Sequence, residues 1–100
     1  MEVRFRTNKL QKQYENSKDA LKAYGDKVGK KYVQRITILK SAKSFDDLYK
    51  IPQFKFHPLT GNRDGEFAIS LTGFYRLIIT NDGDAFDIVK IEEVSKHYDD

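Results

Sequence analysis

A chain of 100 residues has the size of one ordinary domain, and 39% hydrophobic residues with 13% aromatics favour a folded core, so we expect a single domain over residues 1–100. The absence of cysteine excludes disulfides, thiolate zinc sites and cysteine nucleophiles. With no apolar run near the roughly 18 residues that span a bilayer, and no leader block at the N-terminus, we expect a cytoplasmic protein without membrane contact.

The formal charge of +3 divides unevenly, because residues 1–63 carry 15 basic and 6 acidic residues whereas residues 64–100 carry 3 and 9. A positive first part favours a nucleic-acid partner, although a solvated lysine-rich helical surface gives the same count.

Helical spacing dominates the chain up to Pro52. Before it, the alternation of Val3 and Phe5 with charged neighbours predicts a short first strand. Three helices follow, predicted from apolar spacing and capping residues: residues 8–24, capped by Asn8 and ended by Gly25; residues 29–42; and a short helix that begins after Ser44 and ends before Pro52.

Alternation of apolar and polar residues dominates after Pro52. It predicts strands at 53–57, 67–72, 74–79 and 86–91, a loop at 58–65, a turn at Gly73, a hairpin turn at Asp82-Gly83, and a polar tail over 92–100. The most apolar segment, 74–79, is expected at the centre of the sheet. This order predicts an α+β fold, with the N-terminal strand and two to three helices packed on one face of an antiparallel β-sheet. The other sheet face is then partly open, and we expect a site there.

The motifs of most familiar enzymes are absent from the sequence. Its histidines are His57 and His97, and neither belongs to a metal-binding motif. The Gly61–Gly65 segment matches neither a dinucleotide fingerprint nor a P-loop, and there is no nucleophile-elbow motif. We therefore expect neither a metal nor an organic cofactor.

Basic and aromatic residues at strand ends, in the loop and in the tail form the remaining constellation: Lys55, His57, Arg63, Arg76, His97 and Tyr98. Cleavage of RNA without a metal needs a base for the 2′-hydroxyl, an acid for the leaving 5′-oxygen and cations for the phosphate. These residue types supply all three functions.

Each of these residues also has a purely structural interpretation. His57 is then a strand-end histidine bonded to the loop, and Arg76 is the partner of a carboxylate. Arg63 and the His97-Tyr98 pair are then solvated surface residues. Four aromatic residues are expected in the core rather than as stacking platforms for bases: Phe54, Phe56, Phe67 and Phe86.

The segment Phe56-His57-Pro58-Leu59-Thr60-Gly61-Asn62-Arg63-Asp64-Gly65-Glu66-Phe67-Ala68-Ile69, followed by Gly73-Phe74-Tyr75-Arg76-Leu77, resembles a known family. It is similar to the HigB-like branch of the RelE/ParE toxin superfamily, the plasmid maintenance killer proteins. Their pattern is a hydrophobic-His-x-Leu-x-Gly-x-Arg-x-Gly block, then an aromatic-x-Ile strand, then an aromatic-Arg-hydrophobic strand. The family's order of elements matches the predicted order across nearly the whole chain.

The resemblance implies a toxin of a bacterial type II toxin–antitoxin system. Such a toxin is a ribosome-dependent, metal-independent endoribonuclease that cleaves mRNA in the ribosomal A site. Its implied partners are the ribosome with its mRNA and a HigA-like helix-turn-helix antitoxin.

The same resemblance implies roles for individual residues. His57, Arg63 and Arg76 match the family's loop histidine and arginines, while His97 and Tyr98 lie near its C-terminal Tyr/His pair. We expect His57 and His97 to share proton transfer and Arg63 and Arg76 to hold the phosphate. Tyr98 would orient the substrate or stack on a base, and Lys55 would bind the substrate.

The sequence departs from the family pattern at two places. Ser70 stands where many members carry arginine, and the tail Ser95-Lys96-His97-Tyr98-Asp99 orders its residue types differently from the family's Asp-Tyr-His. The assignment of base and acid therefore stays open. Two other functions stay open as well: a ParE-like toxin that blocks DNA gyrase without catalysis, and a degenerate binding module, for which Ser70 argues.

Overall fold

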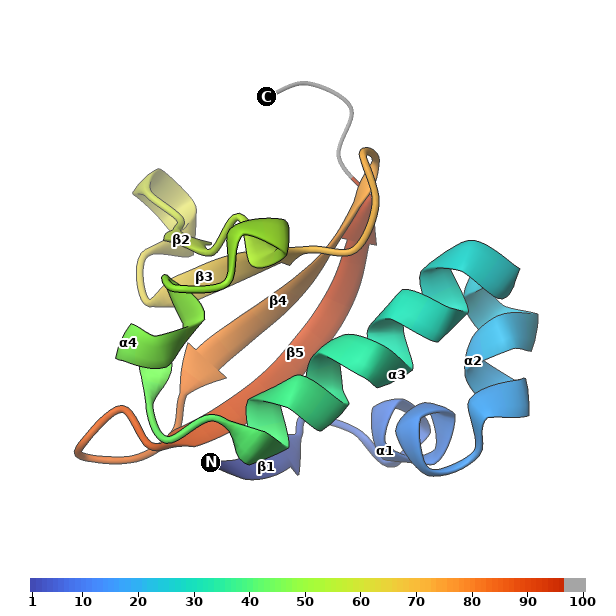
Figure 1. Cartoon of the computed structure of the whole chain (residues 1–100), viewed down its shortest axis with the longest axis horizontal. Coiled ribbons are helices and arrows are strands. Elements are labelled where there is room, and N and C mark those ends of the chain that lie inside the picture. Colours follow the sequence, from blue (N-terminus) through green and yellow to red (C-terminus); the bar gives the residue numbers. More distant parts are fainter. Residues whose placement is uncertain (97–100) are drawn as a thin grey trace.

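One mixed sheet forms the scaffold of the computed structural model, which describes residues 1–96 (Figure 1). Its strands are β1 (Glu2–Phe5), β2 (His57–Pro58), β3 (Glu66–Ser70), β4 (Tyr75–Asn81) and β5 (Ile88–Lys96). They lie in the order β1-β5-β4-β3-β2. β1 pairs with β5 in parallel, and all other neighbours are antiparallel. β4 is central, as its apolar sequence predicted.

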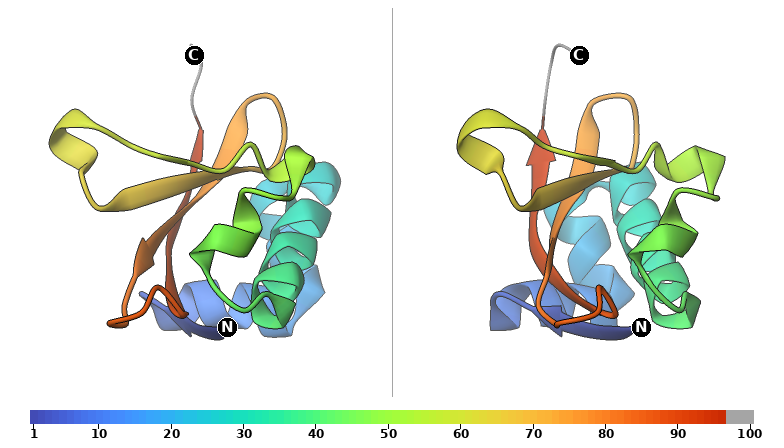
Figure 2. Two further views of the ribbon diagram at one scale, coloured as in Figure 1. Left: turned by 60° about the vertical axis from the view of Figure 1, so that its left-hand side comes forward. Right: turned by 90° about the vertical axis from the view of Figure 1, so that its left-hand side faces the viewer.

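The helices cover one face of this sheet. They are α1 (Asn8–Glu15), α2 (Ser17–Tyr24), α3 (Asp26–Ser41) and α4 (Phe45–Leu48), with the short 3₁₀ turns η1 (Pro52–Phe54) and η2 (Gly61–Arg63). Figure 2 shows the helices on one side of the sheet and η2 projecting on the other. The predicted α+β class is confirmed. In residues 1–96, no helix has the length and apolar character needed to cross a membrane.

The prediction of one helix over residues 8–24 is wrong. The chain leaves helical geometry at Asn16, whose side-chain oxygen accepts a hydrogen bond from the Lys18 backbone N–H (3.2 Å) and so caps α2. α1 is capped by Thr7 rather than by Asn8, because the Thr7 Oγ1 accepts from the Leu10 N–H (3.1 Å). Both caps satisfy backbone donors that the first turn of a helix leaves unbonded.

The helix predicted over residues 29–42 corresponds to α3. It begins at Asp26, three residues earlier than predicted, so Gly29 lies inside it. A Cβ at Gly29 would stand only 2.8 Å from the Ala20 carbonyl oxygen and the Leu21 backbone nitrogen. This glycine therefore permits the close approach of α2 and α3. Gly25 ends α2 as predicted, with φ +85°.

The prediction of a strand over residues 53–57 is also wrong. Pro52 opens η1, Lys55 has left-handed backbone (φ +46°), and only His57 and Pro58 pair with β3. Phe54 and Phe56 are nevertheless both buried. The period-2 pattern arises here because a tight turn buries two rings, not because the segment is extended.

The last strand is longer and begins later than predicted. β5 starts at Ile88 and continues to Lys96, through much of the predicted polar tail. Phe86 lies before it, with left-handed backbone (φ +53°) and a side chain 48% exposed, so its expected place in the core is wrong. Of the other three aromatics, Phe54 and Phe56 are buried and Phe67 packs partly buried against the core.

The core lies between the helices and the sheet. Its largest fully buried side chains come from α3, α4, η1 and the three long strands: Tyr32, Ile36, Leu39, Leu48, Phe54, Ile69, Leu77, Ile79, Val89 and Ile91. Burial of this much apolar surface is what holds the sheet against the helices. The opposite face of the sheet stays available for polar side chains.

Candidate active site

The register of the sheet brings several predicted site residues to the face that the helices leave open. Across β3 and β4, Ala68 pairs with Ile78 and Ser70 with Arg76, while His57 of β2 pairs with Ala68. Their neighbours in sequence belong to the helix-side core. Because side chains alternate along a strand, these residues point to the open face.

A pocket of about 270 Å³ lies on this face. Its lining consists of Lys55, His57, Ala68, Ser70, Thr72, Gly73 and Arg76. Three predicted site residues, Lys55, His57 and Arg76, thus share one pocket. An imidazole that shares a pocket with two cationic side chains can move a proton next to a bound anion.

The His57 ring is oriented by its own turn. Its Nδ1 lies 2.8 Å from the Lys55 carbonyl oxygen. Since a carbonyl oxygen can only accept, Nδ1 must carry the proton, which leaves the lone pair of the neutral ring on Nε2. The left-handed backbone at Lys55 makes this short contact between residues i and i+2. His57 is exposed, so Nε2 can meet a substrate.

Arg76 enters the pocket from the central strand β4, where it is half-buried. Its backbone pairs with Ser70 of β3 on one side and with Ser95 of β5 on the other, which fixes the point where the side chain leaves the sheet. Arg76 thus lines the pocket, and its two interpretations, site cation and partner of a carboxylate, both stay predictions.

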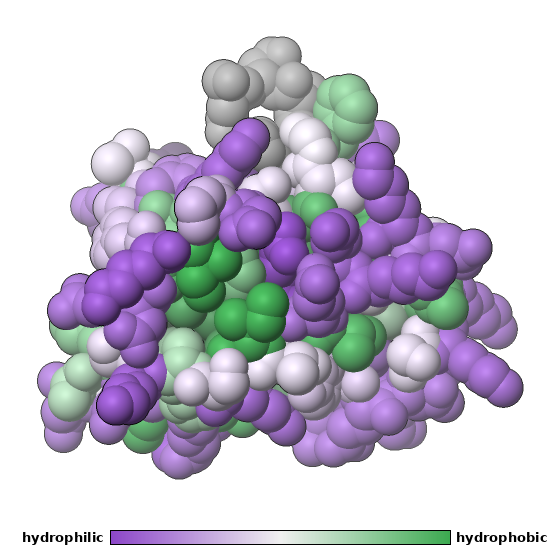
Figure 3. Space-filling view, in the orientation of Figure 1, coloured by the Kyte–Doolittle hydropathy of each residue, from purple (hydrophilic) through white to green (hydrophobic). Residues whose placement is uncertain are grey.

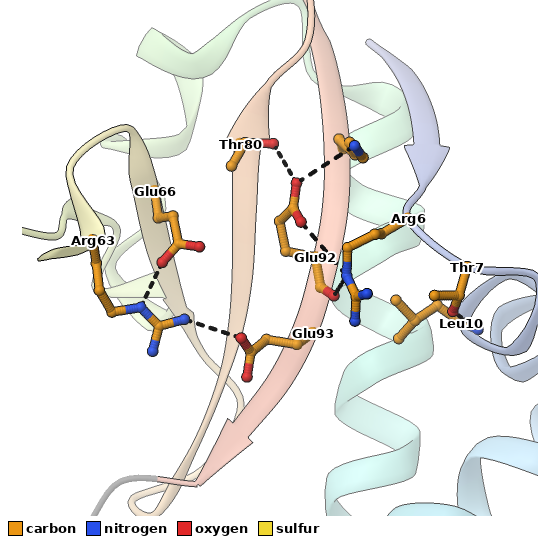
Figure 4. A network of polar contacts seen from close by, with 9 residues as sticks. Arg6, Thr7, Leu10, Arg63, Glu66, Thr80, Glu92 and Glu93 are labelled. Carbon is orange, nitrogen blue, oxygen red and sulfur yellow. Dashed lines mark hydrogen bonds and ion pairs between the residues drawn. The ribbon is translucent and has the colours of Figure 1, made fainter.

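Arg63 does not line this pocket. Figure 4 shows its guanidinium between two carboxylates, with Nε bonded to Glu66 and Nη2 bonded to the Glu93 Oε2 at 3.0 Å. The hydrogen bond to Glu66 is the main reason that the pKa of Arg63 lies above its ordinary value. Its role as a phosphate ligand stays a prediction, and requires a phosphate to compete with these carboxylates.

The two glutamates on β5 reach the open face through an irregularity of the sheet. The pairing of β4 with β5 shifts between Ile78 and Ile79, so Glu92 has no directly opposite partner. Glu93 then reaches Arg63, while Glu92 accepts from the Thr80 Oγ1 (2.8 Å) and pairs with Arg6 (3.6 Å) (Figure 4). A network of ion pairs therefore covers the face beside the pocket.

His97 and Tyr98 lie outside the described residues. The last described residue, Lys96, pairs with Tyr75, and Ser95 pairs with Arg76. The assignments of His97 and Tyr98 stay predictions.

Sequence reasoning missed the turn that forms one wall of the pocket, Thr72 and Gly73, and the acidic partners of Arg63. The contact of Glu66 with Arg63 could be predicted from the sequence, because Glu66 follows Arg63 by three residues. The contact of Glu93 could not be predicted, because it depends on the shifted register. Within residues 1–96, no three His, Asp or Glu side chains gather closely enough to hold a metal ion.

Comparison with solved structures shows which known proteins share this fold. No family model and no curated protein matches the chain. Among solved structures, YafQ from E. coli strain BL21(DE3) superimposes with a TM-score of 0.63 and 16% identity, covering 95% of this chain and 91% of that one. The chain therefore has the same fold as YafQ. A YoeB/ParE toxin from Agrobacterium tumefaciens has a TM-score of 0.58 at 17% identity, covering 98% and 100% of the two chains.

A third similar structure is the YoeB-YefM complex from Staphylococcus aureus. It has a TM-score of 0.60 at 21% identity, covering 98% of each chain. The RelE/ParE-like fold expected from the sequence motifs is thereby confirmed for nearly the whole chain. The narrower HigB branch stays a prediction, carried by the motif residues alone.

Proposed function

We propose that this chain is the toxin of a type II toxin–antitoxin pair, and that it cleaves mRNA in the ribosomal A site without a metal. The observation that carries the proposal is the pocket that gathers Lys55, His57 and Arg76 on the open face of the sheet. The likeness of the whole fold to YafQ and YoeB supports it. Fold likeness alone does not select the chemistry, because one scaffold hosts several functions.

The proposed reaction begins at His57. Its Nε2 takes the proton of the RNA 2′-hydroxyl, and the 2′-oxygen attacks the adjacent phosphorus. Lys55 and Arg76 stabilise the negative charge that builds on the non-bridging oxygens. The bond to the 5′-oxygen then breaks, leaving a 2′,3′-cyclic phosphate.

An acid must protonate the departing 5′-oxygen, and we propose His97 for this role. Tyr98 would orient the substrate, and Arg63 would add a second phosphate contact. Ser70 lines the pocket where many relatives carry arginine. Loss of one such cation costs roughly 2–4 kcal/mol of transition-state stabilisation, so we expect a slower enzyme than an arginine-bearing relative.

The proposed partners are the ribosome with its mRNA and a HigA-like helix-turn-helix antitoxin. The YoeB-YefM structure is a complex of a protein with this fold, which supports an antitoxin partner. The basic first part of the chain supports contact with RNA.

The first test is to map mRNA 5′ ends in cells shortly after the protein is induced. We expect new ends within translated frames, absent for His57→Ala and for His97→Ala. Lys50→Ala is the matched control, because Lys50 is exposed and lies outside the pocket. Circular dichroism of each purified variant checks that it folds. Full cleavage by both histidine variants would contradict the assignment of proton transfer to His57 and His97.

The same experiment separates the two other functions. Growth arrest with intact mRNA would indicate a blocking toxin of the ParE kind, and DNA gyrase would be the next target to assay. Neither arrest nor cleavage would indicate a degenerate module, the interpretation that Ser70 favours.

A further inference from the structure

Three large hydrophobic side chains are exposed in residues 1–96: Tyr49 (55%), Phe74 (60%) and Phe86 (48%). Tyr49 packs its ring against Phe56 at a centroid distance of 4.7 Å, and Phe86 packs against Phe45 at 5.5 Å. Phe74 makes no ring contact within the described part of the chain. Aromatic packing therefore accounts for the position of Tyr49 and Phe86 but not for that of Phe74.

The backbone of the β3–β4 turn holds Phe74 in place. The backbone N–H groups of Leu71 and Thr72 donate to the Tyr75 carbonyl oxygen (2.9 and 3.1 Å), and the Phe74 N–H donates to the Thr72 Oγ1 (3.4 Å). Figure 1 places this turn at the top of the molecule, and Figure 3 shows a hydrophobic group projecting there from a mostly hydrophilic surface. The ring is thus presented to solvent by a well-bonded turn.

The same turn is a wall of the candidate active site. Thr72 and Gly73 both line the pocket that holds Lys55 and Arg76, so Phe74 follows the pocket wall directly in sequence. Among residues 1–96, and apart from Gly73 itself and its two chain neighbours, no atom lies within 4 Å of the place where a Cβ on Gly73 would stand. An exposed ring and a cationic pocket are therefore neighbours on one edge of the molecule.

This pairing has the chemistry that a nucleotide requires. The cations of the pocket attract a phosphate, and an aromatic face beside them can stack on the attached base. We propose that Phe74 is the stacking platform for a base of single-stranded RNA next to the phosphate held in the pocket. This inference rests on the proposed function and deepens it, since it assigns a substrate contact outside the predicted catalytic set.

Stacking of a base on Phe74 would strengthen RNA binding and fix the position of the strand, with little preference for the base, because every base has a π-face. Phe74→Ala should weaken binding of short RNA by roughly 5- to 150-fold, and should raise KM similarly while kcat stays near that of the parent. Phe74→Tyr should bind like the parent, because it keeps the ring. An unchanged dissociation constant for Phe74→Ala would overturn the proposal.

A direct test uses the absence of tryptophan from the chain. Phe74→Trp introduces a single indole, which is titrated with a short oligoribonucleotide carrying 2′-O-methyl groups that block cleavage. We expect saturable quenching of its fluorescence as a base stacks on the ring. Tyr49→Trp and Phe86→Trp are the matched controls, because both positions are exposed aromatics outside the pocket. Their fluorescence should not change.

An abasic oligonucleotide of the same length provides the second control. Equal quenching by the abasic chain would overturn stacking, because no base is present. These readouts do not depend on cleavage, so a protein that never cuts RNA can still support or refute the role of Phe74. If Phe74→Ala keeps its RNA affinity but escapes neutralisation by the antitoxin, the ring belongs to a protein interface and the proposal fails.

Discussion

Arg35 is a buried cation beneath the candidate active site. Its side chain on α3 is 6% exposed, and its Nε donates to the Ser70 carbonyl oxygen at 3.1 Å. The guanidinium also lies over the Phe54 ring, 5.2 Å from its centre. Burial lowers the pKa of Arg35 below its ordinary value. This one side chain therefore joins α3 to the end of β3 and to η1, the elements that carry Ser70 and precede Lys55.

Arg35→Ala should lower the free energy of unfolding by about 2–3 kcal/mol, because it removes a charged hydrogen bond and leaves a carbonyl oxygen without its donor. Urea denaturation measures the loss. Lys30→Ala, an exposed change on the same helix, should alter stability by less than about 0.5 kcal/mol. Equal effects of the two substitutions would show that Arg35 has no such bridging role.

Single residues of the site were predictable where local sequence decides their position. Arg76 lies in an apolar segment whose pattern predicts a strand. Side chains alternate along a strand, so Arg76 faces either the core or the open face of the sheet, and both its interpretations follow from that choice. Arg63 was not predictable in the same way. Its bond to Glu93 joins residues 30 apart and depends on the shifted pairing of β5.

At the level of elements, the contact between α2 and α3 depends on Gly29. Alanine is favoured over glycine inside a helix by about 1 kcal/mol, so helix propensity alone predicts that Gly29→Ala stabilises the protein. The structure predicts the opposite, because the added methyl group would lie 2.8 Å from backbone atoms of Ala20 and Leu21, which cannot move aside as a side chain does.

We expect Gly29→Ala to lower the free energy of unfolding by about 1–3 kcal/mol, measured by thermal and urea denaturation. Gly73→Ala is the control, since a Cβ there meets no atom within 4 Å among residues 1–96, its two chain neighbours apart. A stabilised Gly29→Ala protein would mean that the two helices separate at little cost.

The errors in the predicted elements have a common cause. Leu10, Tyr14 and Leu21 keep one helical period across residues 8–24, so periodicity conceals the break at Asn16. Phe54 and Phe56 likewise imitate a strand in a segment that is a turn. Spacing records which side chains are buried, and two backbone paths can bury the same set. Element order and the central place of β4 were predictable, because they depend on longer patterns.

For the whole molecule, a buried tyrosine sets the response of stability to alkali. Tyr32 is fully buried, and its hydroxyl donates to the Leu10 carbonyl oxygen at 2.7 Å, joining α3 to α1. Burial is the main reason that the pKa of Tyr32 rises above the ordinary value of 10.0. Because the folded-state pKa is the higher one, this contribution to stability is complete below pH 10 and is lost as the pH rises above it.

Tyr32→Phe should therefore show a smaller loss of stability between pH 8 and pH 11 than the parent protein, although it starts about 1 kcal/mol lower for want of the hydrogen bond. Urea denaturation at the two pH values measures the difference. Tyr49→Phe, at an exposed site, should follow the parent. Identical alkaline losses for all three proteins would exclude Tyr32 as the titrating group.

The parallel pairing of β1 with β5 bears on how the protein is made. Within residues 1–96, β1 is an edge strand that pairs with β5 alone, with Glu2 opposite Ile88. During translation, β1 is made more than 80 residues before its partner β5, which also brings Val89 and Ile91 to the core. The pairing of β1 can form only once residues 88–91 have been synthesised. A nascent chain that stops before Ile88 therefore lacks both the partner of β1 and two residues of the core, and it should not reach the folded state.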